Sequence, residues 1–291
     1  MGHRPHAVRS RAPRQPPDKD VTQTGANVPL WVYNIPLIPL AVIMIVAIEV
    51  VALCGLVLVR RYLLPRLQFH DGVNDAVSGT VQAIGVFYGI TVGLIAAGVW
   101  ATYSNAGDLT SHEAVAIASL YRDVSSLPEP ARTTLSTELR DYTVAVITQD
   151  WPAQRQAQTS NASKQILDQF QATLMAFEPV SAGEQARYSE TLSAFNYFVL
   201  QRRLRLDAVQ GGLSLTMWSV IWLGAVISIG VGYFFYFEDI KLHAIMIALI
   251  AGFLGIVLFM IVINDRPFAG QDSLSPDSYQ LILDTLIVPD R

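Results

Sequence analysis

Four long runs of this chain are rich in apolar residues and almost free of charge. The first lies between Asp20 and Arg60 and contains a single charged residue, Glu49. The other three contain no Asp, Glu, Lys, Arg or His, and they cover residues 76–107, 208–237 and 244–264. A helix needs about 20 mostly apolar residues to cross a hydrocarbon core about 30 Å thick. The pattern therefore predicts four membrane-spanning helices.

Flanking residues set the predicted limits of these spans. We expect the first span at about 35–59 and the second from about 78 to 101. The third should cover 213–237, and the fourth should end at Asn264. Aromatic residues near the span ends suit the belt that forms at a membrane surface. No proline follows the second span, so its helix is predicted to continue beyond the membrane to about Ser125.

The region between the second and third spans has ordinary soluble composition. Apolar residues at helical spacing predict helices at 132–150 and 164–177. Ser181 with Glu184 forms a capping box that opens a further helix. We expect that helix to run without a break into the third span. The result would be a helical domain of about four helices, two of them continuing from spans.

These features predict an all-α protein with four spans and a helical soluble domain inserted between spans 2 and 3. The Pro- and Arg-rich residues 1–30 should form a disordered basic tail. The remaining segments are spans 1 and 2 in 31–103, the soluble domain in 104–212, spans 3 and 4 in 213–264, and a C-terminal segment with a short helix in 265–291.

The orientation of the spans follows from the positive-inside rule, which weights basic residues close to the spans. An arginine cluster beside the third span places the soluble domain in the cytoplasm. Arg60 and Arg61, beside the first span, favour the opposite orientation. We prefer the first arrangement, a multi-pass protein of the cell (inner) membrane whose soluble domain is cytoplasmic.

Composition argues against several classes of function. The net charge of −4 gives no case for a nucleic-acid partner. The single cysteine, Cys54, cannot form an intrachain disulfide or a cysteine-based metal cluster. His112-Glu113 lacks the second histidine of a zinc-binding helix, and no phosphate-binding loop or nucleophile elbow occurs. We expect no enzyme, no metal site and no cofactor, and a lipid bilayer as the main partner.

Glu49 is the sharpest single feature of the spans. A carboxylate at the centre of a spanning helix costs about 2.5–3.5 kcal/mol or more, so it usually faces the helix bundle or a water-filled path. Antiparallel packing would put Glu49 at the depth of Tyr88, whose hydroxyl is a plausible partner. Two roles remain open: a functional group on a path, or a structural group that holds two helices together.

The second span carries small residues at a strict spacing of four, and Gln82 lies on the same stripe: Gly85, Gly89, Gly93 and Ala97. Such a stripe lets another helix approach closely, within the chain or from a second chain. A pore lined by the stripe is a less favoured alternative. The cluster Arg202, Arg203 and Arg205 would bind lipid head groups or concentrate anions at the mouth of a path.

Several short motifs between residues 70 and 286 resemble those of bacterial bestrophin-like proteins. They are Asn74-Asp75, the Gly-rich span from Tyr88 to Trp100, Glu113-Ala114, Tyr142, Trp151-Pro152, Arg202 to Leu206, and Asp265-Arg266-Pro267-Phe268-Ala269-Gly270. The last motif is the most specific. In this chain three residues separate His70 from Asn74, a pair that we expect to be adjacent in the family.

The resemblance implies four spans and a helical insertion. By analogy with bestrophins it also implies a homo-oligomer around an ion path, for small anions. The alternative is a non-conducting scaffold or sensor whose helical domain binds a partner. We further expect the motif Asp265-Arg266-Pro267 to fix the exit of the fourth span against the basic end of the soluble domain.

Overall fold

The computed structural model describes residues 30–66, 73–158, 160–235, 237–271 and 273–287. Within these ranges every regular element is a helix, which confirms the all-α class for the described part of the chain. The basic tail and His70 lie outside the described residues. In chain order the α-helices are α1 (Leu37–Leu58), α2 (Val73–Ser125), α3 (Ala131–Ala145), α4 (Trp151–Arg155), α5 (Ala162–Met175), α6 (Ala182–Val209), α7 (Leu215–Gly232), α8 (Ile240–Asp265) and α9 (Asp277–Ile282).

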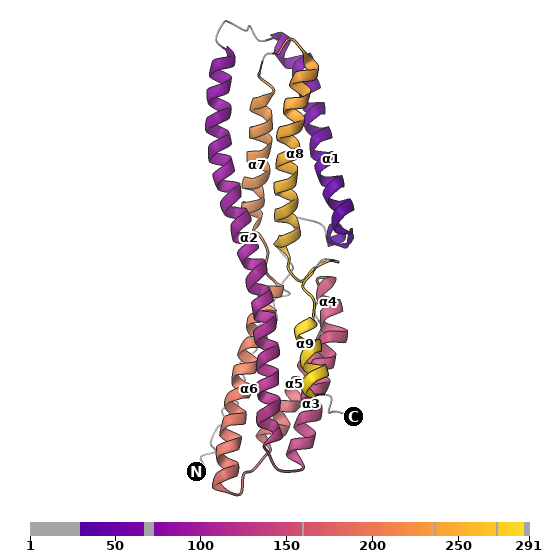
Figure 1. Ribbon diagram of the computed structural model, residues 1–291, viewed down its shortest axis with the longest axis vertical. Coiled ribbons are helices and arrows are strands. Elements are labelled where there is room, and N and C mark those ends of the chain that lie inside the picture. The colour runs from indigo at the N-terminus through magenta and orange to yellow at the C-terminus, as the bar shows by residue number, and fades with distance from the viewer. Residues whose placement is uncertain (1–29, 67–72, 159, 236, 272, 288–291) are drawn as a thin grey trace, which may run out of the picture.

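Four helices are long and apolar enough to cross a membrane, as the sequence predicts: α1, α2, α7 and α8. They lie side by side in one half of an elongated molecule (Figure 1), and we call α1, α7, α8 and residues 73–103 of α2 the span bundle. Helix α1 packs against α8, whereas α2 packs against both α7 and α8. Helices α7 and α8 thus lie between α1 and α2 in the span bundle (Figure 1).

Helix α2 runs the full length of the molecule (Figure 1). It contains 53 residues and ends at Ser125, which confirms the predicted extension. An α-helix rises about 1.5 Å per residue, so α2 is about 80 Å long, more than twice the hydrocarbon thickness of about 30 Å. The distal half of α2 supplies one wall of a second bundle.

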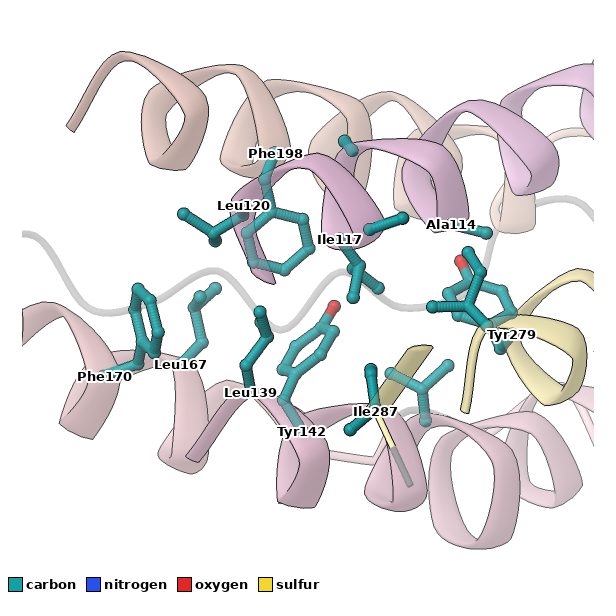
Figure 2. Packing of buried hydrophobic residues seen from close by; sticks show 14 of the residues in the cluster. Ala114, Ile117, Leu120, Leu139, Tyr142, Leu167, Phe170, Phe198, Tyr279 and Ile287 are labelled. Atoms are coloured by element: carbon teal, nitrogen blue, oxygen red, sulfur yellow. The ribbon is translucent and has the colours of Figure 1, made fainter. Parts of the chain in front are cut away.

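This second bundle, which we call the distal bundle, consists of residues 104–125 of α2 together with α3, α4, α5, α6 and α9 (Figure 1). A continuous apolar core joins these helices, and Figure 2 shows Ile117 and Leu120 of α2 facing Leu139 and Tyr142 of α3. Ile117, Leu120, Leu139 and Tyr142 are at most 1% exposed. The helices predicted at 132–150 and 164–177 correspond to α3, with its terminal π turn Val146–Asp150, and to α5.

Helix α6 starts where the sequence predicts but does not continue into the third span. The Ser181 hydroxyl accepts from Glu184 N, as the capping box predicts, whereas the Glu184 carboxylate accepts from Val180 N, one residue before the cap. The expected unbroken helix is wrong: α6 ends at Val209, and α7 begins at Leu215 with Ser214 as its cap. Glycine is a poor helix former, so the pair at 211–212 ends one helix, and Ser214 starts the next.

Candidate functional site

A buried ion pair lies at the centre of the distal bundle. Glu113 from α2 and Arg205 from α6 are both 0% exposed. Arg205 Nε donates to Glu113 Oε2 at 2.6 Å, and Tyr142 on α3 donates its hydroxyl to Glu113 Oε1 at 2.7 Å. Both carboxylate oxygens therefore have donors. Burial of an ion pair is tolerated only when such additional hydrogen bonds are present.

The guanidinium of Arg205 is also held by α4 and α9. Its Nη1 donates to Gln154 Oε1 at 3.2 Å. Its Cζ lies 5.5 Å from the ring centroid of Trp151 and 5.9 Å from that of Tyr279. A cation near aromatic faces is attracted by their negative quadrupole. Five segments of the chain, α2, α3, α4, α6 and α9, thus meet around a single guanidinium.

The same burial shifts proton equilibria in this cluster. Burial, and then the charge of Glu113, raises the pKa of Tyr142 well above its ordinary value. Burial is also the largest cause of the raised pKa of Tyr279. Burial alone would lower the pKa of Arg205, but the charge of Glu113, the neighbouring phenols of Tyr279 and Tyr142 and the hydrogen bond to Glu113 together outweigh burial and hold that pKa above its ordinary value. Arg205 is therefore a permanent cation, and both phenols stay protonated at neutral pH.

A smaller polar cluster lies one helical turn away along α6. Ser163, at the start of α5, donates its hydroxyl to Asp150 Oδ2. Arg202 Nη2 donates to the Ser163 hydroxyl at 3.2 Å. Asp150 and Ser163 are buried, at 2% and 0% exposure. Arg202 thereby links α6 to α5 and to the end of α3.

These contacts correct the expected arginine cluster. Arg205 is fully buried and paired, so it binds no lipid head group and faces no vestibule. Arg202 is partly buried and bonded to Ser163, whereas Arg203 is exposed. The physical reason is helical spacing: residues 202 and 205 fall on the packed face of α6, and residue 203 falls on the opposite face.

The C-terminal motif joins the two bundles. Asp265 Oδ1 accepts from Leu213 N at 2.6 Å, directly at the junction between α6 and α7. Phe268 is 2% exposed, and its ring meets the Trp151 ring edge to face at 5.6 Å. Gly270 N donates to Arg155 O at 3.0 Å.

The backbone of Gly270 explains why the motif ends in glycine. Its φ is +88°, a conformation that other residues rarely adopt. A Cβ there would also collide with the backbone oxygen of Tyr33. Pro267 O accepts from Leu274 N at 2.8 Å, and Leu274 O in turn accepts from Trp151 Nε1 at 2.8 Å. Arg266 extends toward Gly212, where its Nε lies 3.9 Å from the position of an added Cβ. The exit of α8 is thus fixed against the start of α7 and against α4.

Glu49 and Tyr88 are not partners. The Tyr88 hydroxyl donates instead to Ile221 O on α7 at 2.9 Å, and its ring fills the space left by Gly224. Glu49 lies at the seam of α1 and α8, where a Cβ on Gly252 would be 2.7 Å from Glu49 Oε1. Equal depth in antiparallel helices does not specify which helices are neighbours, and here α7 and α8 separate α1 from α2 (Figure 1).

The small-residue stripe of α2 faces outward. A Cβ built at Gly85, Gly89 or Gly93 would meet nothing within 4 Å. Ala97 and Gln82 are exposed as well. The close approach that such a stripe permits is not used by any described residue of the same chain.

Sequence reasoning missed the central ion pair. Glu113 and Arg205 each lay inside a quoted motif, but no sequence pattern joined two residues that are 92 positions apart. One signal in the sequence indicates that Glu113 is buried. It lies on the same helical face as the apolar residues Ala114, Ile117 and Leu120 that follow it. No group of three or more metal-binding side chains occurs within the described ranges.

Comparison with known proteins bears on the same region. The family model for the bestrophin-like domain matches residues 40–279, which include the spans, the buried ion pair and the start of the C-terminal helix. Neither a curated protein nor a solved structure matches the chain. Because the family model covers most of its length, the chain belongs to the bestrophin-like family, and it is a membrane protein.

Proposed function

We propose that copies of this chain assemble in a cell membrane into an oligomer that encloses an ion path along α2. The observation that carries the proposal is the unpartnered stripe at Gly85, Gly89 and Gly93. Small residues in a spanning helix let a second helix approach closely, and lipid provides no hydrophobic drive to replace such contacts. In the oligomer this surface would contact either a helix of a second copy or the water inside the path.

Other glycines of the span bundle make the contrast clear. A Cβ on Gly55 would lie 2.5 Å from the Tyr233 hydroxyl, and one on Gly255 would lie 3.1 Å from Ile45 Cα. One on Gly224 would enter the Tyr88 ring. In these cases the missing side chain makes room for a neighbour within the chain. The α2 stripe has the same composition but no such neighbour, which supports a contact between chains.

The length of α2 supports a path that continues past the bilayer. Polar and charged residues are exposed at both ends of the stripe, Gln82 at one end and Asn105 and Asp108 beyond the other. In our proposal the distal bundle lies in the cytoplasm and extends the path. Family resemblance favours small anions, and the exposed Arg203 would attract them. The exposed Asp108 would repel anions. The balance of charge at the mouth of the path would therefore decide whether anions or cations enter.

The decisive experiment combines assembly with flux. Wild-type protein should form a ring with a central opening in single-particle images and should pass chloride in reconstituted vesicles. Gly89→Leu should abolish both, because its side chain would occupy the stripe. Gly230→Leu is the matched control, since a Cβ at Gly230 on α7 also meets nothing within 4 Å but lies off α2. Monomers in a lipid bilayer would refute the assembly.

A non-conducting scaffold or sensor is the second candidate. It is favoured by an outward-facing apolar row on α6 in the distal bundle, where Tyr197, Leu200 and Leu204 are 51%, 51% and 40% exposed. Well-folded oligomers that pass neither chloride nor potassium would remove the channel and leave this candidate. A protein captured in mild detergent should then be lost after Leu200→Gln.

A further inference from the structure

A groove lies between α2, α7 and α8 on the side of the span bundle next to the distal bundle. Its volume is about 310 Å³, within the range of about 300–1,000 Å³ typical of small-ligand sites. Its wall combines an apolar part and a polar part: Leu94, Ile95, Gly98, Val99, Thr102, Gly212, Leu213, Met217, Asn264 and Asp265. None of the functions above uses it.

The aromatic residues beside the groove put it at the expected boundary between head groups and acyl chains. Trp100 stacks on Tyr103 with centroids 6.0 Å apart, and such aromatic pairs mark the membrane surface. Thr102 lies at this level. Leu94 lies eight residues earlier on the same helix, which is about 12 Å deeper at the helical rise of 1.5 Å per residue. Leu94 and Met217 are 70% and 46% exposed, so the deep part is open to the bilayer.

Polarity along the groove has the same direction as polarity along a lipid. Its deep part is apolar, and its polar groups gather at the surface end. There Asn264 Nδ2 donates to Met260 O at 2.8 Å, and no described residue donates to Asn264 Oδ1. Thr102 donates its own proton to Gly98 O at 3.1 Å, which leaves its oxygen as an acceptor. The surface end therefore presents acceptors and suits a polar group that donates hydrogen bonds.

We infer that this groove binds one lipid, with an acyl chain against Leu94 and Met217 and a donor-bearing polar end at Asn264. An ammonium head group provides such donors, whereas a quaternary choline does not. Asp265 lines the same end, but its carboxylate accepts from Leu213 N and has Arg266 beside it, so the preference for an ammonium rests on the acceptor oxygens of Asn264 and Thr102. Gly98 keeps the groove open, since a Cβ there meets nothing within 4 Å.

The test is lipid retention by the purified full-length chain, measured by native mass spectrometry. Wild-type protein should keep one phosphatidylethanolamine per chain and should keep phosphatidylcholine less. Gly98→Leu should lose this lipid, because a leucine side chain fills the groove. If Gly98→Leu does not fold, Met217→Trp is the alternative variant, because its larger side chain fills the groove from α7. Gly230→Leu, outside the groove, should retain the lipid.

A further variant separates the two ends of the site. Asn264→Leu should retain a lipid but lose the preference for phosphatidylethanolamine over phosphatidylcholine. Equal retention of both lipids by wild-type protein would overturn the assignment. So would unchanged retention in both groove-filling variants, or an image of the assembled protein with a helix of a second copy in the groove. The inference is independent of ion flux, because the groove does not include the α2 stripe.

Discussion

In the distal bundle the large apolar side chains of the core point inward, apart from the exposed row on α6, whereas in the span bundle many point outward. Leu120 and Leu135 of the distal bundle are 0% exposed, but Leu94, Val51 and Leu249 of the spans are 70%, 71% and 70% exposed. Water surrounds the first kind of bundle and would penalise such exposure, while lipid accepts it. The distal bundle therefore completes its own core, whereas the apolar side chains on the outside of the span bundle suit a lipid surrounding.

The placement of polar groups differs in the same direction. The distal bundle encloses a charged pair with several hydrogen bonds. In the span bundle the internal polar contacts are single ones, such as Tyr88 to Ile221 O and Tyr233 to Ala52 O. Stability and assembly should therefore respond to different residues: stability to the ion pair, and the assembly that we propose to the α2 stripe.

Removal of one partner of the ion pair should have the largest effect on stability. Arg205→Ala leaves Glu113 charged and buried without its cation, which typically destabilises a protein by about 3–5 kcal/mol. Thermal unfolding of the purified protein should show a large decrease in Tm. Arg203→Ala, two residues away and exposed, should leave Tm almost unchanged.

The double variant Glu113→Leu/Arg205→Met distinguishes the ion pair from simple loss of packing. It removes both charges while keeping apolar volume, so it should recover much of the stability that Arg205→Ala loses. Equal Tm values for Arg205→Ala and Arg203→Ala would contradict the central position of Arg205 in the distal bundle.

A substitution at the joint of the two bundles should have an intermediate effect. Gly270→Ala forces a side chain onto a residue at φ +88° and against the backbone of Tyr33, at a cost of about 1–3 kcal/mol. Gly230→Ala, in open space on α7, is the matched control. If both variants unfold at the temperature of the wild type, the C-terminal motif does not hold the bundles together.

A change of pH should have no effect near neutrality, and at alkaline pH it should act partly through two buried phenols of the distal bundle. Burial raises the folded-state pKa of Tyr142 and Tyr279 above the ordinary value of about 10, so the folded state holds their protons more tightly than the unfolded state. This stabilisation is complete below the unfolded pKa and is lost as pH rises above it. The loss is about 1.4 kcal/mol per pH unit for each tyrosine.

The corresponding measurement is Tm from pH 8 upward in wild-type protein and in Tyr279→Phe, with about 10 as the expected onset. The variant should lose stability less steeply with pH, because one of the two phenols no longer titrates. Identical slopes would show that Tyr279 does not contribute to this transition.

Much of the fold could be predicted from residue patterns because each pattern acts locally. Four apolar runs gave the spans, and the absence of a stop after Tyr103 gave the long α2. Two local errors concern α7: its helix ends at Gly232 instead of residue 237, and Gly211-Gly212 and Ser214 separate it from α6. The candidate site was less predictable, because Arg202, Arg203 and Arg205 look alike in sequence and differ only in which face of α6 is packed.

By itself the sequence determined the spans, the all-helical class and the family motifs, since hydrophobic length and helical spacing are properties of contiguous residues. Only the tertiary structure paired Glu113 with Arg205, placed Tyr88 against Gly224 instead of Glu49, and left the α2 stripe without a neighbour. Those outcomes depend on which helices pack side by side. Side-by-side packing is set by contacts between distant segments, and a pattern along one helix does not encode them.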